Sequence, residues 1–231
     1  MKKFIFISLI SLFLAVPVWA GYTVTTPVSE YGPYFSGPGG EFTLTPGGGL
    51  EVYLNNYSSL AKDQGGYTDS FQTFCLETTE YITTNHTYNV KLNTNAVMGG
   101  TLYPGDPVSV GTAYLYSQFA RGTLSGYDYS DTGVGRTNSA KALQHTIWWL
   151  EGAASDPGPS NIFQNLVTTM FTDPSVDNLN AGVLQFPVLA MNLTNSDDPY
   201  QDQLILVPIP ATILLGLFGL GIGGWKFRKS L

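Results

Sequence analysis

Short runs of alternating apolar and polar residues dominate the first half of the chain and recur near its end. Alternation with a period of two is typical of strands that bury one face, and glycine, proline and asparagine separate such runs at turns. The pattern predicts six strands, at residues 22–26, 41–45, 50–54, 70–77, 88–92 and 184–192. Most of the chain is therefore expected to be β-structure.

The middle of the chain has helical periodicity instead. The predicted helices are 106–120, 140–150 and 161–171. Asp106-Pro107 provides a cap and a first turn for the first helix, Asn138 or Ser139 caps the second, and Ser160 caps the third. Helices inserted into a β-rich chain predict a mainly β, α+β fold, namely a β-sandwich or barrel with a small helical subdomain.

The N-terminal residues have the pattern of a secretion signal. Lys2 and Lys3 precede an apolar run at 4–16, and Ala20 ends a short stretch with small residues where a signal peptidase cuts. We expect residues 1–20 to be a signal peptide that is removed, which indicates an exported protein and excludes a cytoplasmic enzyme.

Residues 207–231 form a second targeting pattern. A rigid extended element precedes an uncharged apolar run that is long enough for a C-terminal transmembrane helix, and a basic cluster follows and is expected to stay in the cytoplasm. The extended element is Val207, Pro208, Ile209 and Pro210, and the basic residues are Lys226, Arg228 and Lys229.

This tail resembles the bacterial PEP-CTERM sorting signal, with Ile209 where a glutamate is usual. The resemblance implies recognition by a membrane exosortase, cleavage near the Pro-x-Pro element, and transfer to the cell surface or the exopolysaccharide matrix. The precursor would be anchored in the inner membrane of a bacterium of Gram-negative type by its C-terminal helix. An ordinary single-pass membrane anchor is the alternative.

The segment between the two targeting patterns, residues 21–206, has the length of one domain and an acidic composition. It contains all seventeen acidic residues of the chain but only five of the ten basic ones, so its net charge is −12. A surface of this charge repels nucleic acid, and no nucleic-acid partner is expected. The sequence contains no cofactor-binding glycine loop and no His/Cys spacing for zinc, so neither a cofactor nor a metal is predicted.

Cys75 is the only cysteine of this exported chain. It cannot form an internal disulfide, so it is either a buried core residue, half of an intermolecular disulfide, or a thiol used in chemistry. Phe74 and Leu76 beside it favour a buried strand.

Two segments together favour the third alternative, in which the Cys75 thiol takes part in a reaction. Phe74-Cys75-Leu76-Glu77 and the helical segment Gln144-His145-Thr146-Ile147-Trp148, with Glu151-Gly152 after it, resemble the signature of bacterial surface thioester domains, over about residues 71–152. The resemblance implies that Cys75 attacks the carboxamide of Gln144, ammonia leaves, and a thioester forms. A surface amine or hydroxyl, on a protein or a polysaccharide, would then displace Cys75. Such a domain is a single-use covalent adhesin or matrix crosslinker and not an enzyme with turnover.

Glu77, His145 and Trp148 are the candidate supporting residues. Adjacent residues on a helix point about 100° apart, so His145 is expected to face away from the bond. Trp148 lies four residues after Gln144 on the same face and is expected to keep water from the thioester.

Two other interpretations remain open from the residues. A cysteine hydrolase would pair Cys75 with His86 or His145. A non-covalent structural or carbohydrate-binding matrix protein would use loop tyrosines for stacking on sugars, and turn aspartates could bind calcium. The tyrosines are Tyr31, Tyr34, Tyr127 and Tyr129, and the aspartates are Asp128, Asp131, Asp197 and Asp198.

Overall fold

The computed structural model describes residues 21–97, 105–131, 133–180, 182–196 and 198–208. The predicted signal peptide and most of the predicted sorting tail lie outside these ranges. No helix within these ranges has both the length and the apolar character needed to cross a membrane.

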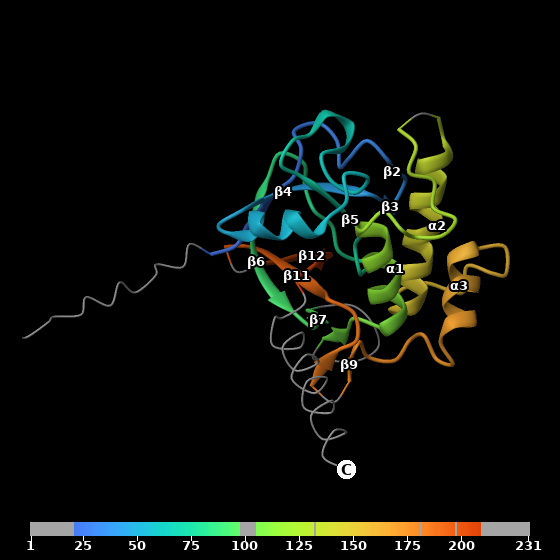
Figure 1. The fold of residues 1–231 in the computed structure, drawn as a ribbon. Helices are drawn as coiled ribbons and strands as arrows, with labels where there is room; N and C mark the ends of the chain where they lie inside the picture. The colour runs from blue at the N-terminus through green and yellow to red at the C-terminus, as the bar shows by residue number, and fades with distance from the viewer. Residues whose placement is uncertain (1–20, 98–104, 132, 181, 197, 209–231) are drawn as a thin grey trace, which may run out of the picture.

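The main element is a six-stranded sheet with strand order β12-β11-β6-β1-β4-β5, in which all neighbours are antiparallel (Figure 1). Its strands are β1 (Thr23–Thr25), β4 (Phe42–Gly47), β5 (Phe71–Thr73), β6 (Thr87–Asn93), β11 (Val188–Asn195) and β12 (Asp198–Leu206). The short strand β1 lies in the centre, where Val24 is opposite Pro46 on one side and Tyr88 on the other.

The sheet curls until its two edges meet. Leu204 N–H donates to Phe74 O (3.1 Å) and Leu76 N–H donates to Asp202 O (3.0 Å), so the residues after β5 pair with β12. Cys75 is thereby placed opposite Gln203. We call this closure, residues 74–76 paired with residues 202–204, the seam.

Three two-stranded ribbons extend the fold. They are β2 (Phe35–Ser36) with β3 (Gly39–Gly40), β7 (Asn95–Ala96) with β8 (Asp106–Pro107), and β9 (Leu179–Asn180) with β10 (Val183–Leu184). The β2–β3 ribbon packs directly against the helix α2.

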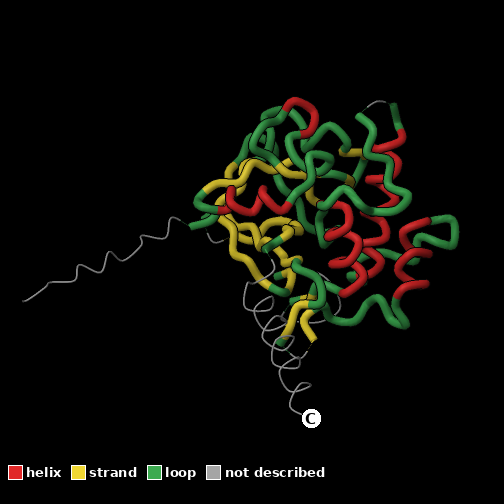
Figure 2. The backbone as a smooth tube through the Cα atoms, in the orientation of Figure 1, coloured by secondary structure: helices red, strands yellow, loops and turns green. Residues whose placement is uncertain are grey.

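The α-helices gather on one side of the curled sheet (Figures 1 and 2). They are α1 (Val110–Ala120), α2 (Gly135–Leu150) and α3 (Ile162–Met170), and two 3₁₀ helices, η1 (Leu50–Asn56) and η2 (Gln64–Gly66), lie in the loops after β4. Aromatic and aliphatic side chains fill the space between helices and sheet. Phe74 of the seam, for example, meets Phe119 of α1 edge-on with ring centroids 5.0 Å apart. The core thus joins the seam to the helical layer.

The mixed, mainly β fold predicted from the sequence is confirmed, and its β part takes the form of a single curled sheet with helices on one side. The prediction of a strand at 50–54 is wrong, because this segment forms η1. Only Leu50 is buried there, while Val52 is 59% exposed. Gly48 and Gly49, with φ of 65° and 99°, turn the chain before it can extend from β4.

The helix starts also differ from the prediction. Residues 106–107 form β8, and α1 begins at Val110, where Ser109 Oγ accepts from Thr112 N–H. The second helix begins earlier than predicted, at Gly135, without a side-chain cap. The third is capped by Asn161 and not by Ser160. Each of the two capped helices begins where a short polar side chain accepts a hydrogen bond from a free backbone N–H of the first turn.

Candidate functional site

Cys75 lies in the middle of the seam with no exposed surface. Burial raises the pKa of its thiol strongly, the indole N–H of Trp148 opposes this, and the charge of Glu77 adds to it. A buried thiol with a raised pKa is inert toward solvent reagents. Any reactivity of Cys75 therefore depends on a partner that is held against it.

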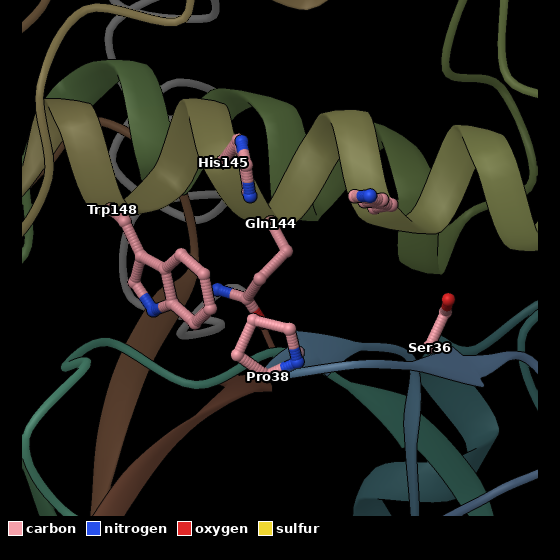
Figure 3. Close-up of a pocket in the computed structure, with 7 residues that line it drawn as sticks. Ser36, Pro38, Gln144, His145 and Trp148 are labelled. Carbon is pink, nitrogen blue, oxygen red and sulfur yellow. The ribbon is translucent and has the colours of Figure 1, made fainter.

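Gln144 is that partner. It points inward from α2, is fully buried, and extends past Trp148 toward the β2–β3 ribbon (Figure 3). The Cys75 N–H donates to Gln144 Oε1 (3.2 Å), and Gln144 Nε2 donates to the Cys75 carbonyl oxygen (2.8 Å). The carboxamide is thus paired with both backbone polar groups of Cys75 and cannot turn freely.

The sulfur lies at the same carboxamide. Cys75 Sγ donates to Gln144 Oε1 at 3.3 Å. A carbonyl bond is about 1.2 Å long, so the carboxamide carbon is within roughly 4.5 Å of the sulfur. The Cys75 N–H already points at the oxygen on which negative charge would develop during attack. The nucleophile, the electrophile and one oxyanion donor are therefore assembled by two residues.

Trp148 closes the site on the side of the C-terminal end of α2. Its side chain is 4% exposed, and its Nε1 has no hydrogen-bond partner of good geometry among the described residues. The indole N–H nevertheless lies near enough to the Cys75 thiol to favour the thiolate form. The sequence predicted that Trp148 keeps water from a thioester, and it did not predict that the indole N–H lies beside the thiol.

Gly39 of the β2–β3 ribbon packs onto the site from the other side. A Cβ atom at this position would lie 2.7 Å from Gln144 Cγ and 2.7 Å from the Trp148 ring. Only glycine allows the ribbon to approach so closely. The sequence signal was present in the stretch Gly37-Pro38-Gly39-Gly40, but alone it indicated a turn and not a cover.

A shallow depression leads to Gln144 between α2 and the ribbon, and it is too narrow to admit a water molecule. Its lining residues are Ser36, Pro38, Gly39, Lys141, Gln144, His145 and Trp148 (Figure 3). Lys141 and His145 are exposed, and the His145 ring lies 5.7 Å from the Trp148 ring. His145 is on the outer side of the depression, as helical geometry predicted, while Gln144 is at its base.

Glu77 does not point at the Cys75–Gln144 pair. Its Oε2 accepts from Asp202 N–H (3.2 Å), and its carboxyl group lies with those of Glu80 and Asp202. Its effect on Cys75 is electrostatic, because its negative charge raises the pKa of the thiol. The sequence motif named Glu77 but gave no sign of its two acidic neighbours.

A second buried polar contact fixes the N-terminal end of α2. Arg136 and Glu41 are both fully buried, and their two hydrogen bonds, Nε to Oε1 and Nη2 to Oε2, measure 2.8 and 2.9 Å. The Arg136 guanidinium also lies 4.0 Å from the Tyr34 ring centroid. This pair was not found from the sequence, because its members are 95 residues apart and no motif connects them.

The residues of the carbohydrate interpretation are mostly occupied in packing. Tyr34 and Tyr127 are each 7% exposed, and their hydroxyls donate to Asp131 and Glu41. The Tyr31 ring packs at a tilt against the Phe35 ring, with ring centroids 4.9 Å apart. Tyr129, on the same side as Tyr127, is also packed against the core. These side chains do not form an open stacking platform.

The candidate calcium aspartates that the structure describes, Asp128, Asp131 and Asp198, also do not converge. Asp128 Oδ1 accepts from Ser130 N–H, and Asp131 contacts Tyr34 and Arg136. Asp198 is exposed at the start of β12, and Asp197 lies outside the described residues.

The cysteine hydrolase interpretation needs a histidine at Cys75. His86 pairs with Asn195 (2.9 Å) and packs on Tyr88 with ring centroids 4.6 Å apart. His145 is on the outer side of α2. Within the described ranges the side chain that contacts the sulfur of Cys75 as a hydrogen-bond acceptor is Gln144.

Of the predicted targeting residues only Val207 and Pro208 are described. Val207 is 9% exposed and its N–H donates to Pro187 O (2.8 Å), so the chain remains packed on the domain to this point. Ala20, Ile209, Pro210, Lys226, Arg228 and Lys229 lie outside the described residues.

Comparisons with known proteins leave the site to be judged by its geometry. No family model matches the sequence, and neither a curated protein nor a solved structure matches it significantly.

Proposed function

We propose that this protein is a covalent adhesin or matrix crosslinker of a bacterial cell surface, acting through an internal thioester between Cys75 and Gln144. The observation that carries the proposal is the separation of 3.3 Å between Cys75 Sγ and Gln144 Oε1, together with the Cys75 N–H on the same oxygen. A buried thiol and a buried carboxamide in this arrangement have a high effective concentration toward each other.

Bond formation takes two steps. The sulfur of Cys75 adds to the carboxamide carbon of Gln144, and the oxygen that becomes negative is held by the Cys75 N–H. The C–N bond then breaks, and the nitrogen leaves as ammonia after taking the thiol proton. One S–C bond has replaced one C–N bond, so no oxidant, reductant or energy source is consumed.

Capture of a target follows the same path with a different nucleophile. An amine or hydroxyl on a protein or a polysaccharide adds to the thioester carbon, the C–S bond breaks, and the proton of the nucleophile returns to Cys75. The product is an amide or ester on Gln144 and a free thiol. Because the depression above Gln144 admits no water in the present conformation, the acyl group is protected until the β2–β3 ribbon or a side chain moves.

The fold supports such a bond mechanically. Cys75 belongs to the seam and Gln144 to the helical layer, so a thioester would tie the closed sheet to α2. In this interpretation the curled sheet acts as a barrel that is closed at Cys75, and the three helices act as a small subdomain that delivers the glutamine.

Export and sorting belong to the same proposal. The chain would lose residues 1–20, be held in the inner membrane by a helix within residues 207–231, and be processed by an exosortase for delivery to the cell surface or exopolysaccharide. Replacing Pro208 and Pro210 by alanine should leave the precursor in the inner membrane, as measured by cell fractionation. Unchanged surface delivery would contradict the sorting part and leave the thioester part standing.

The intact mass of the full chain, purified in detergent, tests the thioester directly. We expect a deficit of about 17 Da against the mass of the processed sequence, because one ammonia is lost. Methylamine should convert this species to one about 14 Da above the unmodified mass and release one thiol. A full unmodified mass with no methylamine product would overturn the proposal.

Three variants complete the test. Cys75→Ala and Gln144→Ala should each lack the deficit and the methylamine product. Gln164→Ala is the matched control, since Gln164 is also a buried helical glutamine but lies on α3 without a cysteine partner. If the control lost the deficit as well, the loss would reflect damage to the fold.

A non-covalent carbohydrate-binding function is the second candidate, favoured by one observation. An open polar cleft of about 480 Å³ lies beside Tyr34, between η2 and the start of α2, and Asp63, Gln64, Asp131 and Thr137 line it. Carboxylates and hydroxyls that line a cleft can bind sugar hydroxyls. Binding of exopolysaccharide that survives Cys75→Ala and is lost on Asp63→Ala would favour this function.

A further inference from the structure

Three carboxyl groups converge at the end of the seam where Leu76 pairs with Asp202. Glu77 follows Cys75 by two residues, Glu80 lies three residues further, and Asp202 is on β12. One oxygen from each of the three lies within 4.8 Å of the other two. Glu77 is 2% and Asp202 1% exposed, while Glu80 is half-buried.

The pairing of the sheet edges forces this meeting. Leu76 N–H donates to Asp202 O (3.0 Å), and Asp202 N–H donates to Glu77 Oε2 (3.2 Å). Asp202 Oδ2 is fixed in turn by Val97 N–H and Asn192 Nδ2. The carboxyl groups of Glu77 and Asp202 are therefore each held in place by hydrogen bonds.

Within the part of the chain that the structure describes, no basic side chain forms an ion pair with these carboxyl groups. The ion pairs within the described residues are those of Arg136 with Glu41 and Asp131, so Glu77, Glu80 and Asp202 have no basic partner there. Burial, and after it the charges of neighbouring carboxylates, raise the pKa of Glu77 to about 10 and that of Asp202 to about 7. The folded protein thus favours whatever neutralises these groups.

An independent observation points to a ligand. Glu77 Oε1 and Glu80 Oε2 are both shielded from solvent and have no hydrogen-bond donor. The two carboxyl groups are also in contact with each other. Buried carboxylate oxygens without a donor are costly, and either a shared proton or a cation between them would remove that cost.

We propose that Glu77, Glu80 and Asp202 bind a calcium ion at the seam. An all-oxygen set with three carboxylates suits a hard cation, whereas zinc prefers nitrogen and sulfur ligands. Calcium tolerates an irregular, flexible ligand set, and magnesium demands a near-octahedral one and keeps most of its water. The two strand edges that the ion would bridge supply the ligands, Glu77 and Glu80 from one and Asp202 from the other.

The ion would also act on the thioester, a consequence that rests on the proposed function. A cation between Glu77 and Asp202 fixes the pairing of Leu76 with Asp202, which holds the backbone of Cys75 against Gln144. Calcium would therefore speed thioester formation as well as stabilise the fold.

Thermal unfolding of the full chain in detergent at pH 8 tests the site. After treatment with EGTA, addition of Ca²⁺ to about a hundred times its Kd should raise Tm by about 5 °C or more, and Mg²⁺ should do much less. Calorimetric titration should give one Ca²⁺ per chain. Equal Tm in EGTA and in millimolar Ca²⁺ would overturn the proposal and leave a carboxyl cluster held by protons.

Variants assign the ligands. Asp202→Asn should abolish the calcium shift. Glu80→Gln, at a half-buried position that the fold tolerates more easily, should weaken binding at least tenfold. Asp198→Asn is the matched control on the same strand, and because Asp198 is exposed it should keep the full shift. A shift that survives both Asp202→Asn and Glu80→Gln would place the calcium elsewhere and contradict the site.

The mass measurement separates this proposal from the thioester. A calcium shift without the ammonia deficit would retain the cation site and reject the thioester. The ammonia deficit without a calcium shift would retain the thioester and reject the cation site. If both hold, the rate at which the deficit appears after refolding should fall in EGTA, and the Asp198→Asn variant should match the wild type.

Discussion

Two buried polar contacts connect α2 to the sheet side of the molecule, and they differ in how completely they are satisfied. Arg136 uses all five of its N–H groups, on Glu41, Gln64 and two backbone carbonyls. Gln144, eight residues later, has three hydrogen bonds with the described residues, all of them to Cys75, and one of the three is with the thiol. The Arg136 contact has no free donor and holds the helix in place. The Gln144 contact instead places the Cys75 thiol against the carboxamide oxygen, the arrangement on which the proposed thioester depends.

The difference indicates a division of labour along one helix. A buried ion pair is costly to break, and its bidentate geometry fixes both position and rotation. The proposed thioester would need this support, because a carboxamide that is to be attacked must be held within a fraction of an ångström of the thiol. Under this proposal the first contact provides the precision that the second requires.

Removing the holding contact should have the largest effect. Arg136→Met leaves the charge of Glu41 buried without its partner, and we expect the free energy of unfolding to fall by about 3 to 5 kcal/mol. Urea unfolding measures this change. The ammonia deficit should decrease in the same variant, because α2 loses its anchor.

Two variants make this result specific. Arg121→Met removes an exposed arginine at the end of α1 and should change stability by less than about 0.5 kcal/mol. The double variant Glu41→Leu with Arg136→Met should recover part of the loss, since no charge is left unpaired. Equal losses for Arg136→Met and Arg121→Met would refute the anchoring role.

The C-terminal end of α2 offers a third polar contact that sharpens the comparison. Glu151 is buried, its Oε1 accepts from Ser109 Oγ (2.8 Å), and burial raises its pKa from 4.5 to about 7. The folded state therefore holds a proton there that the unfolded state releases. Stability from this group is complete below about pH 4.5 and is lost as pH rises through 7, by about 3 kcal/mol.

Glu151→Gln should remove that part of the pH dependence. We expect the difference in unfolding free energy between wild type and variant to change by about 3 kcal/mol from pH 4.5 to pH 8 in urea titrations. Glu51→Gln, on the exposed side of η1, should leave the wild-type profile unchanged. Parallel profiles for wild type and Glu151→Gln would show that Glu151 is not the responsible group.

The sequence predicted the elements whose periodicity comes from local packing and missed those that depend on distant pairing. The three helices were found because apolar residues recur along one face. Strand β12 was missed, since Gln201, Asp202 and Gln203 read as a polar loop although each is at most 3% exposed. These side chains are buried because the sheet edges close there, which no local pattern reveals.

The site divides in the same way. Cys75 and Gln144 were named from a motif, and the structure brings them within 3.3 Å. Gly39, Glu80, Asp202 and Arg136 were not named, because their roles arise from contacts between segments far apart in the chain. A single glycine or glutamate in a sequence can have many structural roles, and only the residues packed around it show which role it has.

A smaller effect is expected where the ribbon covers the reactive contact. Gly39→Ala places a Cβ 2.7 Å from Gln144 Cγ and the Trp148 ring, which should cost about 1 to 3 kcal/mol of stability and displace the carboxamide. The yield of the ammonia deficit should fall in intact mass spectra. Gly21→Ala, where a Cβ meets nothing within 4 Å, is the control. If Gly39→Ala gave the wild-type yield of the ammonia deficit, the β2–β3 ribbon would have moved to make room for the methyl group while Gln144 stayed in place.

The smallest effect on stability, and the most specific one on reactivity, is expected at Trp148. Its Nε1 is buried without a good partner, so Trp148→Phe removes an unsatisfied N–H and keeps most of the packing, with a stability change below about 1.5 kcal/mol. The same N–H favours the thiolate of Cys75. Opening of the thioester by methylamine, in which sulfur leaves, should therefore slow by about tenfold, or about 1.4 kcal/mol. Trp149→Phe, on another face of α2, should keep the wild-type rate, and an unchanged rate in Trp148→Phe would leave Trp148 with a packing role alone.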